Sequence, residues 1–524
     1  MTNTLPRVTY SNIGVDFSPV HAHIDSLIPD FEAQVLTKTW STPFASEAAA
    51  SIPSPISPEL SLGKFPRSNA RDVKAAIAAA RNAAKSWNFV SLEDRLAFAE
   101  RWKQVLDQEK YSLGLAALYE VGKSRMEAVG EAEEAVDMLD FYPGELRRNA
   151  GYRRPMNELI ENETAVSVLK PYGVFAVIAP FNFPVALSIG MITGALITGN
   201  TVVYKPSPEC ALTGLLIAET LRKAGLPEGV FNIVLGDGEV GRLLSSDDGI
   251  DGVAFTGGTD TARRINQTLA ARPGPIIPFI AETGGLNGMF VDTTALKEQV
   301  VDDVVLSAFG SAGQRCSALR ILFLPNDTAD LVIETIKGAM DALVIGDPAD
   351  PAVDVGPVID EEACAALAAH LARLEREAKV LHRLEAPEGG TFFGPVLAEI
   401  PSAKFLEREV FGPILHVVRY EPAQLARVAG ELAGQGYGLT LGVHSRIDAF
   451  AREVRALVPA GNVYVNRSII GAVVGVQPFG GEGLSGTGPK AGGPNALSRY
   501  ATERALSVNI TAQGGDPALL NLSL

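Results

Sequence analysis

Residues 173–207 read GVFAVIAPFNFPVALSIGMITGALITGNTVVYKPS, and no charged residue interrupts them before Lys205. In length the run could cross a bilayer, but two prolines break its middle. The pattern predicts a buried strand at Gly173–Ala179, a loop at Pro180–Pro184, then a helix and a second strand at Thr201–Tyr204. Such an apolar strand, helix, strand succession is typical of the core of an α/β sheet.

The same alternation continues along the chain. Short apolar strands are expected at Asn232–Leu235 and Gly252–Phe255, with helices between them, which predicts a doubly wound parallel sheet. Such sheets bind ligands at the carboxyl ends of their strands, where Pro180–Asn182, Lys205–Ser207 and Thr256–Thr259 fall. We therefore expect a nucleotide site at this edge of the sheet.

After Glu282 the alternation restarts. Strands are expected at Gly288–Val291 and Arg320–Leu324, with a helix from Glu298, and the pattern continues to about Val465. This indicates a second α/β domain, and a cleft between the two domains is a natural place for a ligand.

The N-terminal part is expected to differ. Residues up to about Leu62 mix Pro, Ser and Ala without a sustained period, so we expect them to wrap over a surface. Asn69 and Ser91 are suited to cap two helices. The expected inward side chains are Val73, Ile77, Ala80, Ala84 and Trp87 in the first helix and Leu96, Ala99 and Trp102 in the second.

Length and charge restrict the class of protein. A chain of 524 residues predicts about two to four folding units with large apolar cores. The formal net charge is −16 and the pI is about 5.0, so phosphate backbones and anionic bilayers are repelled. We expect neither a nucleic-acid nor a membrane partner.

Three widely spaced cysteines, Cys210, Cys316 and Cys364, predict neither a disulfide framework nor a metal site. They favour a reducing compartment. The N-terminal residues also lack the pattern of a secretory signal, so a cytoplasmic location is expected. His21 and His23 lie in an irregular segment, and we expect no metal there.

Two glycine-containing turns are candidates for phosphate binding. Gly236–Gly241 has the G-x-G-x-x-G spacing, but Asp237 and Glu239 would place negative charge beside a phosphate. A plain tight turn explains it at least as well, so no phosphate is assigned to it. Thr256–Thr259 leaves a strand and opens a helix, where its backbone N–H groups could bind an anion or simply form a cap.

A candidate nucleophile, Cys316, lies in the small-residue loop Ser311–Ala318. Small neighbours let a substrate carbon approach the sulfur, and the adjacent Arg315 would favour a thiolate. The alternative is a buried, inert thiol. Glu282, in AETGG at 281–285, is a candidate base or a residue that caps a turn. None of the histidines is near Cys316 in sequence, which weakens a cysteine-protease interpretation.

Six short segments, in this order and spacing, resemble the aldehyde dehydrogenase superfamily over about Ser68–Ser507. A match of six parts is far more specific than any one part. The segments are PFNF at 180–183, YKPS at 204–207, FTGG at 255–258, ETGG at 282–285, GQRC at 313–316 and EVFGP at 409–413. The resemblance implies an α/β fold with a doubly wound Rossmann-type cofactor domain, an α/β catalytic domain and a small oligomerisation hairpin.

The C-terminal part narrows the resemblance to one branch. Residues 463–467 (VYVNR) and 471–486 (GAVVGVQPFGGEGLSG) are similar to L-glutamate γ-semialdehyde dehydrogenases, which act on 1-pyrroline-5-carboxylate, and most similar to the dehydrogenase half of bifunctional proline-utilisation proteins. This implies oxidation of that aldehyde to L-glutamate in proline catabolism, by a stand-alone enzyme. The alternatives are another carboxylated semialdehyde as substrate, or a non-catalytic binding protein.

The resemblance also implies roles for individual residues. Cys316 attacks the aldehyde, and the Asn182 side chain with the Cys316 backbone N–H holds the oxyanion. Glu282 activates the water that hydrolyses the resulting thioester, which disfavours transfer to coenzyme A. The implied substrate contacts are Ser317, Gly471 and Ala472 for the carboxylate and Phe183 and Phe479 for the methylene stem.

By the same resemblance the cofactor is NAD, with NADP left open because Ser207 beside Lys205 could also receive a 2′-phosphate. Glu409 is expected at the second ribose, Phe411 at the nicotinamide end, and the pyrophosphate over the helix start at Gly257–Thr259. The full expected set is Ile178, Pro180, Phe181, Lys205, Ser207, Glu209, Gly257, Gly258, Thr259, Glu409 and Phe411.

The implied domains are a dinucleotide-binding domain at 1–151 and 172–282, a catalytic domain at 283–496, and an oligomerisation arm with a C-terminal tail at 152–171 and 497–524. A strand near 505–511 is expected to complete the arm. Because such arms cross a subunit interface in the family, a homodimer or a larger homo-oligomer is expected.

Overall fold

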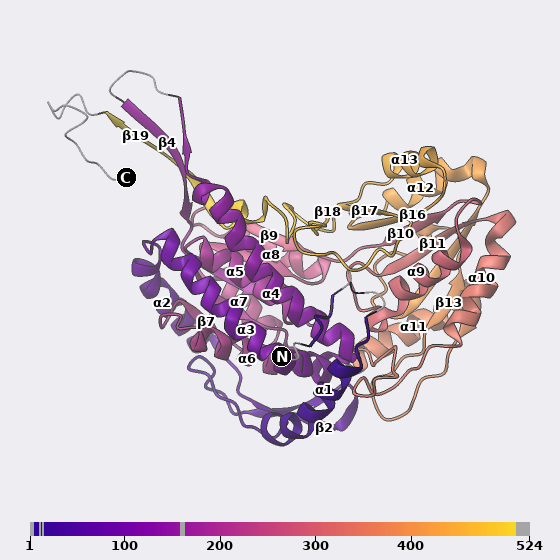
Figure 1. Ribbon diagram of the computed structural model, residues 1–524, viewed down its shortest axis with the longest axis horizontal. Coiled ribbons are helices and arrows are strands. Elements are labelled where there is room, and N and C mark those ends of the chain that lie inside the picture. The colour runs from indigo at the N-terminus through magenta and orange to yellow at the C-terminus, as the bar shows by residue number, and fades with distance from the viewer. Residues whose placement is uncertain (1–4, 10–11, 13–14, 158–162, 510–524) are drawn as a thin grey trace.

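The computed structural model describes residues 5–9, 12, 15–157 and 163–509. Two α/β units lie side by side, and a narrow arm projects from the first (Figure 1). Each unit is built on its own sheet, which confirms the α/β fold expected from the sequence.

The first unit, on the left in Figure 1, contains a five-stranded parallel sheet in the order β7-β6-β5-β8-β9. Every residue of β5 and β6 is buried, which explains their uninterrupted apolar sequence. The four predicted strands are present, although β7 ends two residues earlier than expected. The strands are β5 (Val174–Ile178), β6 (Thr201–Lys205), β7 (Phe231–Ile233), β8 (Gly252–Thr256) and β9 (Phe279–Glu282).

Helices cover both faces of this sheet, because side chains alternate along a strand. In β5, Phe175 and Val177 join one apolar core, while Val174, Ala176 and Ile178 join another on the opposite face. The helices are α2 (Ala70–Trp87), α3 (Leu92–Val121), α4 (Arg125–Arg148), α5 (Ala186–Ile197), α6 (Ala211–Lys223), α7 (Gly238–Ser246) and α8 (Thr259–Ala271).

The predicted caps of α2 and α3 are present. The Asn69 side chain accepts hydrogen bonds from the backbone N–H groups of Arg71 and Asp72, and the Ser91 hydroxyl accepts one from Asp94. The expected inward side chains of both helices are buried. Among the described residues, no helix combines the length and the apolar character needed to cross a bilayer.

The second unit contains a seven-stranded sheet in the order β12-β13-β14-β11-β10-β16-β17, parallel except for the edge strand β12. Its strands are β10 (Asn287–Val291), β11 (Leu319–Pro325), β12 (Lys379–Arg383), β13 (Val396–Glu399), β14 (Ile414–Tyr420), β16 (Thr440–His444) and β17 (Asn462–Val465). Its helices are α9 (Lys297–Phe309), α10 (Asn326–Met340), α11 (Glu361–Glu377), α12 (Leu425–Ala433) and α13 (Asp448–Leu457).

The N-terminal segment is more regular than the sequence predicted. Helix α1 (Ser18–Phe31) packs on the first unit through Val20, Ile24 and Phe31. Strands β1 (Ala50–Ser54) and β2 (Ser57–Phe65) form a hairpin after it. The apolar residues Val20, Ile24, Leu27, Ile28 and Phe31 have helical spacing, so this helix was recognisable from the sequence.

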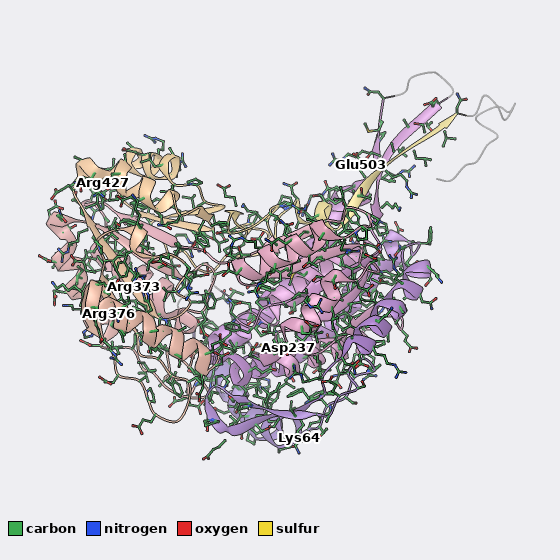
Figure 2. The ribbon with its side chains drawn as sticks, turned by 180° about the vertical axis from the view of Figure 1, so that it is seen from behind. Lys64, Asp237, Arg373, Arg376, Arg427 and Glu503 are labelled. Carbon is green, nitrogen blue, oxygen red and sulfur yellow. The ribbon has the colours of Figure 1, made fainter. Side chains whose placement is uncertain are left out.

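The arm consists of β3 (Arg154–Pro155), β4 (Glu163–Pro171) and β19 (Ala501–Asn509). Nine antiparallel residue pairs join β4 to β19, and the Ser167 hydroxyl donates to Glu503, which Figure 2 labels on the projecting ribbon. The strand expected near 505–511 therefore starts earlier, and residues 158–162 and 510–524 of the expected arm and tail lie outside the described residues.

The base of the arm closes the core of the first unit. The Tyr500 ring is buried 5.3 Å from the Phe175 ring, centroid to centroid. The backbone oxygen of Tyr500 accepts a hydrogen bond of 2.7 Å from the Asn200 side chain, at the turn before β6.

Candidate active site

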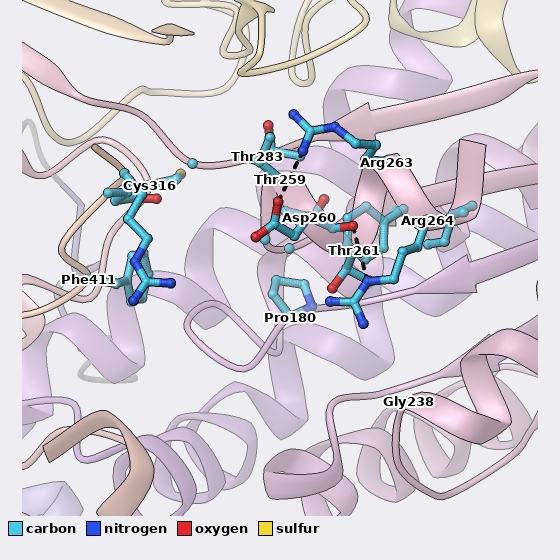
Figure 3. A pocket seen from close by; sticks show the side chains of 18 of the residues that line it. Pro180, Gly238, Thr259, Asp260, Thr261, Arg263, Arg264, Thr283, Cys316 and Phe411 are labelled. Carbon is cyan, nitrogen blue, oxygen red and sulfur yellow. Dashed lines mark hydrogen bonds and ion pairs between the residues drawn. The ribbon is translucent and has the colours of Figure 1, made fainter. Parts of the chain in front are cut away.

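A cavity of about 1520 Å³ has walls from both units. One wall consists of the loops that follow β5, β6 and β8, as expected for a doubly wound sheet. The other includes Cys316, residues 406–411 and one face of α11. Figure 3 shows Pro180 and Thr259 on the first wall, with Cys316 and Phe411 opposite.

Most of the expected cofactor residues line this cavity. The exception is Glu209, which accepts a hydrogen bond from the Ser207 hydroxyl but does not line the cavity itself. The residues that line it are Ile178, Pro180, Phe181, Lys205, Ser207, Gly257, Gly258 and Thr259 on the first wall and Glu409 and Phe411 on the opposite wall.

The start of α8 opens on the cavity. Gly258 precedes the helix, and an added Cβ there would meet no atom within 4 Å. Thr259, Asp260 and Thr261 of the first turn line the cavity; the Thr261 N–H donates to the Gly258 carbonyl oxygen, which leaves the N–H groups of Thr259 and Asp260 for an anion. A helix start in this position is suited to a pyrophosphate.

Lys205 supplies a cation to the same wall. Its side chain is largely buried, and its ammonium group donates to the Pro206 carbonyl oxygen at 3.0 Å. Burial lowers the pKa of Lys205 to about 8, while Glu209 raises it. An anion site, a cation and the carboxylate of Glu409 along one cavity are the groups that a dinucleotide requires, so the residues present fit such a cofactor.

The turn Gly236–Gly241 forms a further part of the wall through Gly238 and Gly241. Asp237 caps α7 by accepting from the Glu239 backbone at 2.9 Å, and its other oxygen pairs with Arg67. The acidic side chain is therefore occupied by a cap and an ion pair, in agreement with the interpretation as an ordinary turn.

Cys316 is half-buried and lies on the cavity wall. Its backbone oxygen accepts from the Asn287 side chain at 2.7 Å. Burial, together with the charges of Glu409 and Glu282, raises the pKa of the thiol to about 12, against a lowering by Arg320. In this state the sulfur is protonated at neutral pH.

Arg315, which the sequence suggested as the group that favours the thiolate, also contacts two other residues in the structure. Its guanidinium is directed to Glu127, at 2.8 Å, and to the Ser311 hydroxyl, at 3.1 Å. The guanidinium that lowers the thiol pKa belongs to Arg320, which is fully buried and pairs with Glu409 at 3.0 Å. Arg320 was not among the residues that the sequence singled out as acting on the thiol.

The loop before Cys316 is strained. Ser311 and Ala312 both have a φ of +52°, which residues other than glycine rarely adopt. At Gly313, with a φ of +67°, an added Cβ would lie 2.2 Å from the Gly412 carbonyl oxygen. The loop is thus packed directly on the segment that carries Glu409, and strain of this kind often accompanies a functional site.

Glu282 is the last residue of β9 and is turned toward the loop Gly480–Gly486. One carboxylate oxygen accepts from the Gly481 N–H at 2.9 Å, and the other has no hydrogen-bond partner. An added Cβ at Gly486 would lie 2.6 Å from this carboxylate. Burial raises the pKa of Glu282 to about 8, and its charge raises the pKa of the Cys316 thiol, although Glu282 itself is not part of the cavity wall.

Asn182 brings a side-chain amide to the same place. It is buried on the cavity wall, and its Nδ2 donates to the Gln314 carbonyl oxygen at 3.0 Å, within the loop that leads to Cys316. The Phe181 and Phe411 rings also meet edge to face, 5.9 Å apart. The structure therefore brings Asn182 and Cys316 together from different units.

The five expected substrate residues are not part of the cavity wall. Ser317 follows the thiol and is buried, and Phe183 lies beside Arg315. Gly471, with a φ of +78°, directs its carbonyl oxygen to Arg467, and Ala472 follows it. Phe479 exchanges two backbone hydrogen bonds with Ala491.

Several polar residues at the site have no clear sequence signal. Lys123 is buried against the Phe183 ring, and Glu127, Glu131 and Arg320 are paired near the loops that carry Asn182 and Cys316. Charged residues are usually exposed, so their burial could only have been suspected from their place in otherwise apolar segments.

Known proteins similar to this chain agree with this arrangement. The bifunctional protein PutA of Klebsiella aerogenes is 38% identical over 540 residues, which cover 98% of this chain and 40% of that protein, so the chain spans about two fifths of this relative. A 1-pyrroline-5-carboxylate dehydrogenase of Geobacillus sp. (strain WCH70) is 34% identical, covering 85% of this chain and 87% of that one.

Among solved structures, 1-pyrroline-5-carboxylate dehydrogenase from Thermus with bound NAD superposes with a TM-score of 0.89 and 31% identity, covering 97% of this chain and 100% of that one. The profile of the aldehyde dehydrogenase family matches residues 45–506. The chain belongs to the aldehyde dehydrogenase family.

Proposed function

We propose that the chain oxidises L-glutamate γ-semialdehyde, the open form of 1-pyrroline-5-carboxylate, to L-glutamate with a nicotinamide dinucleotide. The observation that carries this proposal is the joint position of Cys316 and Asn182 on a cavity at the carboxyl ends of a Rossmann-type sheet. The choice of aldehyde is supported by relatives that are named 1-pyrroline-5-carboxylate dehydrogenase.

A nicotinamide cofactor, when bound, supplies a ring that accepts a hydride. The start of α8 would hold its pyrophosphate, Lys205 and Glu409 its riboses, and Phe411 the nicotinamide end. NAD is proposed over NADP because the Ser207 hydroxyl is bonded to the carboxylate of Glu209, and that negative charge would repel a 2′-phosphate.

The chemistry begins with the Cys316 sulfur. Once its thiol has given its proton to solvent, the sulfur attacks the aldehyde carbon, and the thiohemiacetal oxyanion is stabilised by the Asn182 amide and the Cys316 backbone N–H. Loss of hydride from that carbon leaves a thioester on Cys316.

Glu282 then acts as the base. One of its oxygens is buried without a hydrogen-bond partner, so the side chain would turn from the loop 480–486 toward the thioester to take a proton from water, and a pKa of about 8 makes it a strong base for a carboxylate. The hydroxide that results attacks the thioester carbon, the C–S bond breaks, and L-glutamate leaves.

Substrate selection is proposed for a site on the far side of the thiol from the cofactor cavity. Ser317 and the backbone N–H groups of Gly471 and Ala472 would bind the α-carboxylate, and convergent donors of this kind fix the distance from the anion to the aldehyde. Phe183 and Phe479 would contact the methylene stem.

A homodimer or larger homo-oligomer is proposed from two exposed sheet edges. Strand β17 is at the edge of its sheet and leaves Val463 and Val465 exposed, and the arm of β4 and β19 projects from the first unit (Figure 1). An exposed edge is a template for pairing with another chain.

Free Cys210, Cys316 and Cys364 support a reducing, cytoplasmic location.

The test is turnover by the purified protein. With 1-pyrroline-5-carboxylate and NAD it should form NADH and L-glutamate in equal amounts. A panel that includes succinic semialdehyde, ranked by kcat/KM with NAD and with NADP, decides between this aldehyde and another carboxylated one. Absence of any turnover with 1-pyrroline-5-carboxylate would overturn the proposal.

A further inference from the structure

Helix α4 contacts the loop of the thiol through one carboxylate. Glu127 accepts a hydrogen bond from the Ser311 hydroxyl at 2.8 Å and pairs with the Arg315 guanidinium at 2.8 Å. Ser311 is one of the strained residues of that loop, and Arg315 directly precedes Cys316. Because strained backbone persists only where its surroundings hold it, this contact helps to fix the thiol loop.

One helical turn further along, α4 contacts the loop of the oxyanion amide. Glu131 is buried, and one of its oxygens accepts from the backbone N–H groups of Val185 at 2.7 Å and Ala186 at 3.0 Å. These residues end the loop that carries Asn182 and begin α5. The other oxygen accepts from the Lys123 ammonium group at 2.6 Å.

The Lys123 cation reaches the same loop. It lies 3.3 Å from the centroid of the Phe183 ring, and Phe183 directly follows Asn182. The Arg315 guanidinium is 5.1 Å from that centroid. Each cation beside this ring is therefore paired with a carboxylate of α4.

The Lys123–Glu131 ion pair is fully buried and the Arg315–Glu127 pair is largely buried, and such pairs add little net stability to a fold. Desolvation of the charges offsets most of their attraction, and well-packed apolar residues often give equal or greater stability. Such pairs do select one geometry. At this site they join one helix to two loops, one from each α/β unit.

We propose that Glu127 and Glu131 are positioning residues, which hold the Cys316 thiol and the Asn182 amide at the separation that the tetrahedral oxyanion requires. An oxyanion donor acts only within hydrogen-bond distance of the developing charge, and a shift of about 1 Å can reduce a rate about a hundredfold. The inference rests on the proposed function only in taking Cys316 and Asn182 as the reacting pair.

Hydrolysis of p-nitrophenyl acetate without cofactor measures how well the Cys316 thiol and the Asn182 amide act together. The ester acylates the thiol with release of p-nitrophenolate, through an oxyanion at the same place, and needs neither a hydride acceptor nor the physiological aldehyde. In Glu131→Gln and Glu127→Gln the acylation rate constant should fall by about tenfold or more.

A double-mutant cycle with Asn182→Ala separates positioning from general damage to the fold. Once the amide is removed, its position no longer matters, so either glutamine variant should reduce acylation by less than about twofold in that background. Loss by the same factor with and without Asn182, or no loss in either background, overturns the proposal.

Glu120 provides a matched control. It is also buried, and it accepts from the backbone N–H groups of Leu212 and Thr213 at the start of α6, as Glu131 does at the start of α5. Glu120→Gln should lower the thermal midpoint yet leave acylation within about twofold of the parent. An equal loss of acylation in this variant would show that any buried cap has the same effect, against the proposal.

If Glu131→Gln fails to fold, as judged by circular dichroism, Lys123→Met/Glu131→Gln replaces it in the cycle, because it leaves no uncompensated charge. Failure of the proposed function is distinguishable from failure of this inference. Normal ester hydrolysis without turnover of 1-pyrroline-5-carboxylate would contradict only the function, while additive losses in the cycle would contradict only the positioning role.

Discussion

The pH dependence of acyl-enzyme hydrolysis tests the buried position of Glu282. Burial raises the pKa of this carboxyl from 4.5 to about 8, and only its ionised form can take a proton from water. At pH 7, one unit below the pKa, about one carboxyl in eleven is ionised. The hydrolysis rate constant should therefore rise about tenfold from pH 7 to a plateau above about pH 9, whereas a base of ordinary pKa would give a flat profile.

Stopped-flow hydrolysis of p-nitrophenyl acetate gives this rate constant, because the burst reports acylation and the later steady phase reports hydrolysis of the thioester. Lys490 lowers the pKa of Glu282, so Lys490→Gln should move the midpoint to higher pH. In Glu282→Gln the steady phase should be slow and the burst retained. A flat profile in the parent from about pH 6 to about pH 9, or the same rise in Glu282→Gln, refutes the reasoning.

Cys316→Ala should abolish both the ester burst and NADH formation with an unchanged thermal midpoint, and a remaining burst would place the nucleophile elsewhere. Glu209→Gln should lower KM for NADP several-fold relative to NAD; equal kinetics with the parent would show that this carboxylate does not face the ribose. Gly313→Ala places a Cβ 2.2 Å from the Gly412 carbonyl oxygen and should cost at least about 2 kcal/mol of unfolding free energy. Gly338→Ala, with nothing within 4 Å of the added Cβ, is its control in thermal melts, and equal midpoints would contradict the loop geometry.

The sequence predicted those parts of the fold that depend on local composition. β5 and β6 have apolar sequences because both faces of each strand are buried, and Asn69 was recognisable as a cap because its side chain bonds within its own helix. The fold and the family inferred from the six segments are confirmed by the sheets and by the profile match. Helix α1 was missed although Val20, Ile24 and Phe31, with Leu27 and Ile28 between them, follow a helical period.

The candidate site was predictable where it follows from topology and less so where it depends on distant pairing. Strand ends converge in any doubly wound sheet, so Lys205 and Thr259 could be placed together from the sequence. The partner of Arg315 is Glu127, 188 residues away, and no local pattern reveals such a pair. Lys123 was overlooked because lysine is rarely buried, and only the three-dimensional contact with Glu131 explains it.

The contact of Tyr500 with Phe175 and Asn200 has a consequence for biosynthesis. A ribosome completes all the strands of the first sheet, then the second α/β unit, before Tyr500 leaves the exit tunnel. Domains that emerge early usually begin to fold as soon as they are complete. In this chain the first unit emerges without the ring that completes its core, so its packing can be finished only after the second unit has been synthesised.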